Sequence, residues 1–304
     1  MAFLALSRRA EIDQATAVRA SRKLLATVMM ALSCAVGGAN EFFAMDTIAK
    51  GPPERVVALL QETGFAGLGG TALDETLPRA LQEQGLKFFN GYLVLHCNKP
   101  DAALAGKLER WFAMLEGTDT ALWLAIDGVT TADGTKVGPS DPAGDRVVME
   151  QVRAIADSAA RHGLRVSLYP HAGFWLERFS DTVRLAELCD RPNVGVTFNL
   201  CHWLKVEGTE SDPLPPVRAA LGRLQFVTIN GADAGDTKNM DWGKLIQPLD
   251  AGTYDVAGFV RGLLALGYTG PVGFQGYGIQ DPPRTVLLRT QQAWRKMTGE
   301  QKLP

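Results

Sequence analysis

The sequence predicts a single closed (β/α)8 barrel, because strand-like and helix-like segments alternate eight times from residue 40 onward. The chain has 304 residues, a length that suits one barrel of this kind. Hydrophobic residues make up 46% of it, enough for a large core, and no linker interrupts the alternation. An open doubly wound sheet is the alternative, but residues 46–51 lack the GxGxxG turn that usually follows its first strand.

The eight expected strands are short apolar runs bounded by turn-forming residues. They cover residues 41–45, 65–69, 86–95, 121–126, 165–168, the start of 194–208, 224–229 and 271–274. The helices between them carry apolar residues at helical spacing, and several stop at a glycine, such as Gly64. They cover residues 54–63, 77–84, 101–116, 145–162, 180–190, 213–221, 255–266 and 283–297. We expect residues 130–144 and 230–253 to form long polar loops.

Residues 1–39 are predicted to be a signal peptide, which leaves residues 40–304 as the mature barrel. Basic residues precede the apolar stretch LLATVMMALSCAVGGA, and Gly37 and Ala39 supply the small side chains of a cleavage site. We therefore expect an exported protein, periplasmic or extracellular. An amphipathic helix of the folded domain is the alternative. A lipoprotein attached through Cys34 is less favoured, because Ala31 stands where such signals usually carry leucine.

Charge and hydropathy exclude two classes of partner. The formal net charge is −2 and no basic run occurs, so we expect no nucleic acid. No apolar run reaches the ~18 to 20 residues of a membrane span, so we expect none. The expected partner is a small molecule, and the composition is compatible with a homo-oligomer. Cysteines 34, 97, 189 and 201 show no CxxC spacing, and buried free cysteines are expected.

Polar residues collect at the predicted strand ends, where barrels of this class bind their ligands. The residues there are Asp46, His96, Asp127, Tyr169, His171, Asn199, His202, Asn230 and Gln275. Three of the four histidines belong to this group, which favours a functional role for them. The fourth, His162, ends a helix, where a cation interacts well with the helix dipole. Trp203 and Tyr277 lie nearby, and their faces suit the C–H faces of a sugar, although aromatic residues also serve simply to close a barrel.

Five stretches resemble the sugar phosphate isomerase/epimerase family, a branch of the xylose isomerase-like TIM barrels. They read FFAMD, LYPHAGFW, VGVTFNLCHWLKVEG, FVTINGAD and GPVGFQGYGI, and the similarity covers about residues 40 to 297. Within the family, the chain is most similar to secreted proteins with a Tyr-Pro-His strand end. The resemblance implies a barrel, a carbohydrate or sugar-derived substrate, and isomerisation or epimerisation.

The resemblance also implies a divalent metal held by a Glu, an Asp, a His and a Glu after strands five to eight. This chain has Tyr169, Asn199, Thr228 and Gln275 at those positions. Only the histidine three residues past the Asp position is kept, as His202. Without carboxylates a hard cation such as Mg²⁺ is disfavoured, although His171 and His202 could hold zinc. We therefore predict no metal ligand, and the cofactor stays open.

The preferred hypothesis is proton transfer next to a sugar carbonyl without a carboxylate-bound metal, with His202 or His171 as the base. The predicted substrate-binding residues are Asn199, Tyr169, Asn230, Gln275, His96, Asp127, Trp203 and Tyr277. The alternative is a non-catalytic carbohydrate-binding barrel. Glycoside hydrolysis is disfavoured because Asp127 lacks an acidic partner after strands seven and eight. DNA repair is disfavoured by the missing ligands and the acidic charge balance.

Overall fold

The computed structural model describes residues 40–99 and 101–299, which form a closed barrel of eight parallel strands. This confirms the predicted fold class. Around the barrel the strands follow one another in chain order, and the last pairs with the first. They are β1 (Phe42–Met45), β2 (Gly67–Thr71), β3 (Lys87–His96), β4 (Ala121–Asp127), β7 (Arg165–Leu168), β8 (Val194–Asn199), β9 (Leu224–Ile229) and β10 (Val272–Phe274). The predicted signal peptide and Cys34 lie outside the described residues.

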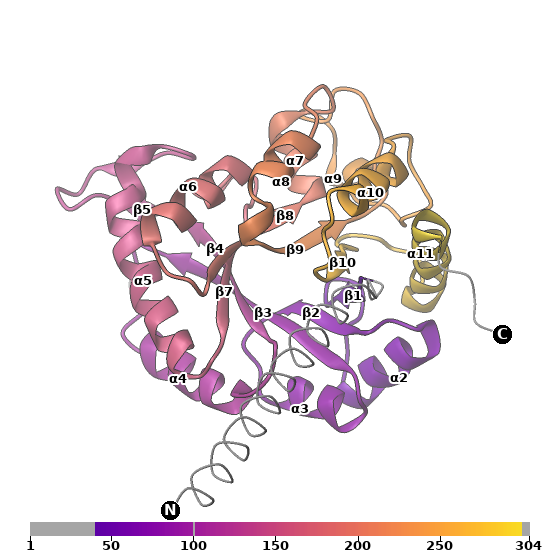
Figure 1. Ribbon diagram of the computed structural model, residues 1–304, viewed down its shortest axis with the longest axis horizontal. Helices are drawn as coiled ribbons and strands as arrows, with labels where there is room; N and C mark the ends of the chain where they lie inside the picture. The colour runs from indigo at the N-terminus through magenta and orange to yellow at the C-terminus, as the bar shows by residue number, and fades with distance from the viewer. Residues whose placement is uncertain (1–39, 100, 300–304) are drawn as a thin grey trace, which may run out of the picture. The chain divides into compact units, whose positions relative to one another are not determined.

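Helices cover the outside of the barrel (Figure 1). They are α2 (Pro53–Thr63), α3 (Thr76–Glu83), α4 (Leu104–Leu115), α5 (Asp145–Arg161), α6 (Phe179–Cys189), α7 (Leu200–Glu207), α8 (Leu214–Ala219), α9 (Trp242–Leu245), α10 (Val256–Ala265) and α11 (Pro283–Thr298). Each long helix turns an apolar stripe toward the strands; on α5 that stripe includes Val148, Val152 and Ile155. Among the described helices, none combines the length and apolarity that a membrane crossing needs.

The second strand begins two residues later than predicted, because Phe65 lies in the turn that ends α2. Gly64 adopts a left-handed conformation with φ 76°, and the Phe65 amide donates to the Leu60 carbonyl at 3.1 Å. This is a helix-ending motif in which an apolar residue follows the glycine and packs back. The Phe65 ring stacks on Phe42 at 5.1 Å. The prediction that Phe65 starts a strand was wrong, because it used only the apolar character of this residue, which here packs against the end of a helix.

Regular structure also occurs where loops were expected. The polar segment after β4 contains a small antiparallel hairpin, β5 (Val129–Thr130) with β6 (Lys136–Val137), and a 3-10 turn at Pro142–Gly144. The segment after β9 contains α9. The polar end of the stretch 194–208 is helical, because α7 starts directly after β8.

The barrel interior is filled by its own side chains. Its apolar cluster contains Phe43, Met45, Phe89, Ala121, Trp123, Ala125, Tyr169 and Phe226. Phe43 stacks on Phe89 at 4.6 Å, and Tyr169 stacks on Trp123 at 4.9 Å. Tyr169 thus ends the packed interior, and any ligand has to meet the protein above it.

Gly273 is required by the packing of Phe43 inside the barrel. A Cβ at position 273 would lie 2.5 Å from the Phe43 ring, closer than such atoms approach. We expect Gly273→Ala to lower the free energy of unfolding by about 1–3 kcal/mol through overpacking, measured by urea denaturation. Gly222→Ala is the matched control, because no atom lies within 4 Å of its added Cβ. Equal stability of the two variants would contradict this account of the interior.

Candidate functional site at the carboxyl ends of the strands

Asn199 joins the last residue of β8 to the first turn of α7. Its backbone is extended, with φ −124° and ψ 116°, and its side-chain oxygen accepts a hydrogen bond from the His202 amide at 3.2 Å. This is the usual N-cap arrangement, in which a short polar side chain satisfies a free amide of the helix. The cap fixes where α7 begins and so fixes the position of His202.

Tyr169 lies at the centre of the site, just past the end of β7. Its hydroxyl accepts a hydrogen bond from the Asn199 side-chain amide and also interacts with the Gln275 side chain. Burial raises the pKa of Tyr169 well above its ordinary value, although the two amides oppose the rise. The phenol is therefore protonated at neutral pH. The Gln275 carbonyl oxygen in turn accepts from the Thr47 hydroxyl at 2.8 Å.

His171 and His202 are brought together beside Tyr169. Their ring centroids are 4.2 Å apart, and the His202 ring meets Tyr169 edge-on at 5.9 Å. Burial lowers the pKa of His171, and it lowers the pKa of His202 well below its ordinary value, with a smaller contribution from His171. Both imidazoles are consequently neutral at pH 7, the form that can accept a proton.

His96 and Asp127 end the neighbouring strands β3 and β4. The two residues are paired in register, and His96 Nδ1 lies 3.4 Å from Asp127 Oδ2. Both side chains are partly exposed. The Asp127 charge also acts on His171, where it opposes the lowering of the pKa by burial. Neighbouring titratable side chains thus follow one another around the rim from β3 to α7. They are His96, Asp127, His171 and His202.

The remaining predicted residues differ in their surroundings. Asn230 is buried and donates to the Leu245 carbonyl, while its side-chain oxygen has no protein partner within the described residues. Trp203 packs on Phe198, and with Asn199 and His202 it lines a small cavity. Tyr277 is 59% exposed, and its backbone amide donates to the Gln275 side-chain oxygen at 3.1 Å. The structure thus groups Tyr169, His171, Asn199, His202 and Gln275, and Trp203 and Tyr277 adjoin that group through these contacts.

Trp242, Thr47 and Ala172 belong to the site although they were not among the predicted site residues. Trp242 begins α9 and meets the His202 ring edge-on at 5.4 Å. Ala172 contacts both histidines through its backbone. A backbone contact leaves no side-chain signal, and the contact of Trp242 depends on the path of a long segment. The residue types alone could not have indicated either.

The donor set does not fit a hard divalent cation. Tyr169, Asn199, Thr228 and Gln275 occupy the positions that the family resemblance assigns to ligands, and none bears a negative charge. Tyr169 and Asn199 bind each other, and the Gln275 oxygen binds Thr47. Mg²⁺ and Mn²⁺ favour carboxylate oxygens. In residues 40–99 and 101–299 no group of three His, Cys, Asp or Glu is arranged to hold a metal ion.

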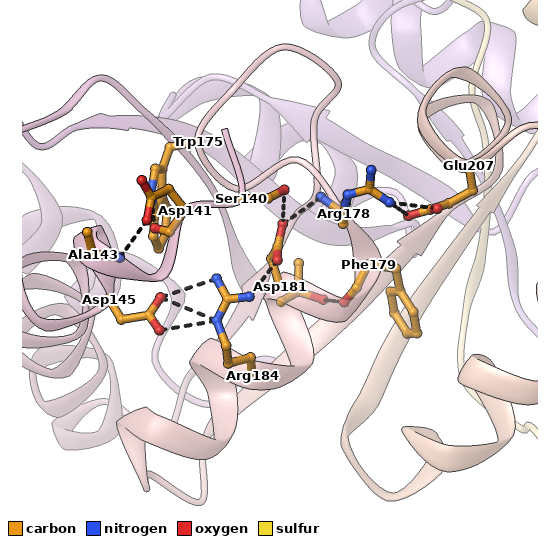
Figure 2. Close-up of polar contacts among 11 residues, drawn as sticks. Ser140, Asp141, Ala143, Asp145, Trp175, Arg178, Phe179, Asp181, Arg184 and Glu207 are labelled. Atoms are coloured by element: carbon orange, nitrogen blue, oxygen red, sulfur yellow. Dashed lines mark hydrogen bonds and ion pairs between the residues drawn. The ribbon is translucent and has the colours of Figure 1, made fainter. Parts of the chain in front are cut away.

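Asp181 holds the loops around the histidines in place (Figure 2). Its carboxylate is 2% exposed and accepts from the Ser140 hydroxyl at 2.5 Å, the Arg178 amide at 3.0 Å and the Arg184 guanidinium at 2.6 Å. The Arg178 guanidinium donates to both carboxylate oxygens of Glu207, at 2.7 and 2.8 Å. These contacts connect the loop after β6, the loop after β7 and the last turn of α7.

A cavity of about 600 Å³ lies at the opposite end of the barrel, beside the amino ends of the strands. Arg165, Gly195, Gln225 and Tyr268 are among the residues that line it, and it includes none of the predicted site residues. In (β/α)8 barrels that end serves stability, whereas chemistry occurs at the carboxyl ends. The histidine pair is therefore the better candidate for a functional site.

The fold is that of a (β/α)8 barrel protein, with polar side chains at the carboxyl ends of its strands. The chain belongs to the xylose isomerase-like TIM barrel family, whose model matches residues 50–297. Among solved structures, it is similar to D-allulose 3-epimerase from Methylomonas sp., with a TM-score of 0.63 and 17% identity over 85% of this chain and 97% of that one. It is also similar to 3-keto-D-glucoside 4-epimerase from E. coli, with a TM-score of 0.64 and 18% identity over 84% and 99%. At these identities the likeness shows the fold alone.

A curated relative, 3-dehydroshikimate dehydratase from Pseudomonas putida, is 25% identical over 173 residues. The match covers 56% of this chain and 25% of that protein. The chain therefore spans about a quarter of the length of the curated relatives it matches.

Asp181→Asn is expected to weaken the loop network in Figure 2. An amide cannot balance the Arg184 charge, and its NH₂ group faces donors, so we expect a loss of about 3 kcal/mol in the free energy of unfolding. Amide hydrogen exchange should accelerate in the loops at 129–144 and 170–178. The control is Asp157→Asn, because Asp157 is half exposed in its pair with Arg191 and its replacement should change stability far less. Unchanged exchange in those loops would refute the role of Asp181.

Asp46, at the end of β1, should make stability depend on pH. Burial raises the pKa of Asp46 from 3.8 to about 6, and Lys50 opposes part of the rise. Its contribution to stability is therefore present below pH 4 and is lost as the pH rises through 6. Asp46→Asn should gain stability relative to the unaltered protein between pH 5 and pH 8, measured by urea denaturation. The control is Asp133→Asn. Its free energy of unfolding should differ from that of the unaltered protein by the same amount throughout this pH range, because hydrogen bonding to Thr131 lowers the pKa of Asp133.

Proposed function

We propose that this protein catalyses proton transfer at a carbon next to the carbonyl group of a sugar or sugar derivative, as an isomerase or epimerase. The observation that supports this most directly is the pair of neutral histidines beside the protonated Tyr169. A neutral imidazole is a competent base near pH 7. Side-chain amides and a phenol are suitable donors to the oxygen on which negative charge develops.

The comparisons support the same reaction class. Two similar structures are named as epimerases of a ketose and of a keto-glycoside, and the curated relatives are named as dehydratases of 3-dehydroshikimate. Epimerisation next to a ketone and loss of water from a hydroxy ketone can both begin with removal of the proton beside the carbonyl. That common first step needs a base and hydrogen-bond donors to the developing oxyanion, and we assign these roles to the histidines and to the amides and phenol at the rim.

We propose that the reaction proceeds without a carboxylate-bound divalent metal. Tyr169, Asn199 and Gln275 stand at ligand positions but supply hydrogen-bond donors and neutral oxygens. These groups would bind sugar hydroxyls and the developing enediolate, with Asn230 and its unpartnered oxygen alongside. His96 and Asp127 would extend the binding surface toward β3 and β4.

The expected activity is exchange of solvent deuterium into a ketone substrate. In D₂O, the protein should introduce deuterium next to the carbonyl of D-allulose, a 3-keto-glucoside or 3-dehydroshikimate, detected by proton NMR. His171→Ala and His202→Ala should each lower the exchange rate by about 10²–10⁴-fold, the usual contribution of one acid–base group. His162→Gln is the control, because His162 is paired with Glu109 and Glu116 outside the site.

Two results would contradict the proposal. Sugar binding without deuterium exchange would favour the alternative of a non-catalytic carbohydrate-binding barrel. A stoichiometric metal in protein purified without added metal, with exchange lost on chelation, would overturn the metal-independent reaction.

A further inference from the structure

The backbone of Ala172 binds both histidine rings, through its carbonyl oxygen and its amide nitrogen. His171 Nδ1 is 3.0 Å from the Ala172 carbonyl oxygen, and the Ala172 amide nitrogen is 3.3 Å from His202 Nδ1. A carbonyl oxygen only accepts hydrogen bonds, so His171 Nδ1 carries a proton. A backbone amide only donates, so His202 Nδ1 presents its lone pair.

The two histidines therefore have opposite tautomers. A neutral imidazole carries one proton, and both rings are kept neutral by burial. With its proton on Nδ1, His171 has a free lone pair on Nε2. With its lone pair on Nδ1, His202 carries its proton on Nε2.

We propose that the backbone of Ala172 divides the chemistry between them, with His171 Nε2 as the general base and His202 Nε2–H as the donor to the substrate carbonyl oxygen. This rests on the proposed function. His171 takes the proton from the carbon beside the carbonyl, and the electrons of the broken C–H bond form the carbon–carbon double bond of an enediolate. The carbonyl π electrons move to the oxygen, which His202 stabilises without giving up its proton. Return of the proton to the same carbon regenerates the carbonyl compound, so exchange with solvent needs no other reactant. Return to the neighbouring carbon, as in isomerisation, also requires a proton to pass from the enediol hydroxyl to the other oxygen.

The surroundings of the two rings differ in the same sense. His171, which becomes an imidazolium, is the ring on which the Asp127 charge acts. Trp242 and Tyr169 meet the His202 ring edge-on, and no charged carboxylate contributes to its pKa. A positive charge is thus better tolerated on His171 than on His202.

A tight turn over residues 171–174 fixes the backbone of Ala172 in this place. The Phe174 amide donates to the His171 carbonyl at 3.0 Å, and Gly173 has φ 84°. A turn with a positive φ at its third residue favours glycine there. The Phe174 ring then stacks on the His171 ring with centroids 4.0 Å apart. The four residues of this turn, 171–174, therefore hold both the Ala172 backbone and the His171 ring.

Nitrogen NMR tests the tautomers without any substrate. Full-length protein with ¹⁵N-labelled histidine would be examined at pH 7.5 by long-range ¹H–¹⁵N correlation, with His171→Gln and His202→Gln used for assignment. We expect the Nδ1–H form for His171 and the Nε2–H form for His202. The same tautomer for both, or the reverse pair, would overturn the inference even if the protein exchanges deuterium.

The two glutamine variants test the division of roles. Glutamine can donate a hydrogen bond but cannot act as a base, so His171→Gln should lower deuterium exchange by about 10²–10⁴-fold. His202→Gln should lower the exchange rate only about tenfold. His202→Leu should lower it about 10²-fold or more, since leucine cannot donate a hydrogen bond. In the unaltered protein, the exchange rate should rise with pH through the lowered pKa of His171 and no longer change near pH 7. His202→Gln should show the same pH dependence. Equal losses in the two glutamine variants would overturn the roles. Expected tautomers without exchange in the unaltered protein would overturn the proposed function and the roles with it, leaving only the tautomers.

Discussion

The arrangement of the site depends on one side chain, the amide of Asn199. Its oxygen accepts from the His202 backbone and caps α7, while its nitrogen donates to the Tyr169 hydroxyl. An aspartate would still cap the helix but could not donate to the phenol. Because an amide has a donor and an acceptor on one planar group, it can link a helix start to the barrel centre. Tyr169, Asn199 and Gln275 are therefore connected to one another by hydrogen bonds, and none of the three carries a charge.

The Asn199 cap also influences the position of the loops, because α7, which it begins, contacts the loop after β7. The cap positions α7, and Glu207 at the end of α7 holds Arg178 in the loop after β7. That loop contains His171 and Ala172. Asp181 then ties the Arg178 amide to Ser140 in the preceding loop. Both imidazoles are thus carried by segments whose two ends are fixed, which suits a site that must hold its geometry to a fraction of an ångström.

Much of this could be read from the sequence, and the failures have physical reasons. Alternating apolar segments gave the barrel, because both faces of its strands are buried and its helices need apolar stripes. Strand-end positions brought Tyr169, Asn199 and Gln275 together, because parallel strands end at one rim. Phe65 was misread, because an apolar residue that follows a helix-ending glycine looks locally like the start of a strand. Tautomers depend on the donor or acceptor that faces each ring nitrogen, and no sequence pattern specifies that partner.

Burial makes the histidine pair asymmetric even apart from its hydrogen bonds. Two imidazoles with centroids 4.2 Å apart cannot both carry a charge in a desolvated site without a large electrostatic cost. Only one of them can take up a proton during a reaction. His171 has the Asp127 carboxylate near it, whereas His202 is 6% exposed and is surrounded by Tyr169, Trp242 and His171. Electrostatics and the backbone hydrogen bonds of Ala172 therefore select the same residue as the proton acceptor, although the first depends on charge and the second on which ring nitrogen carries the proton.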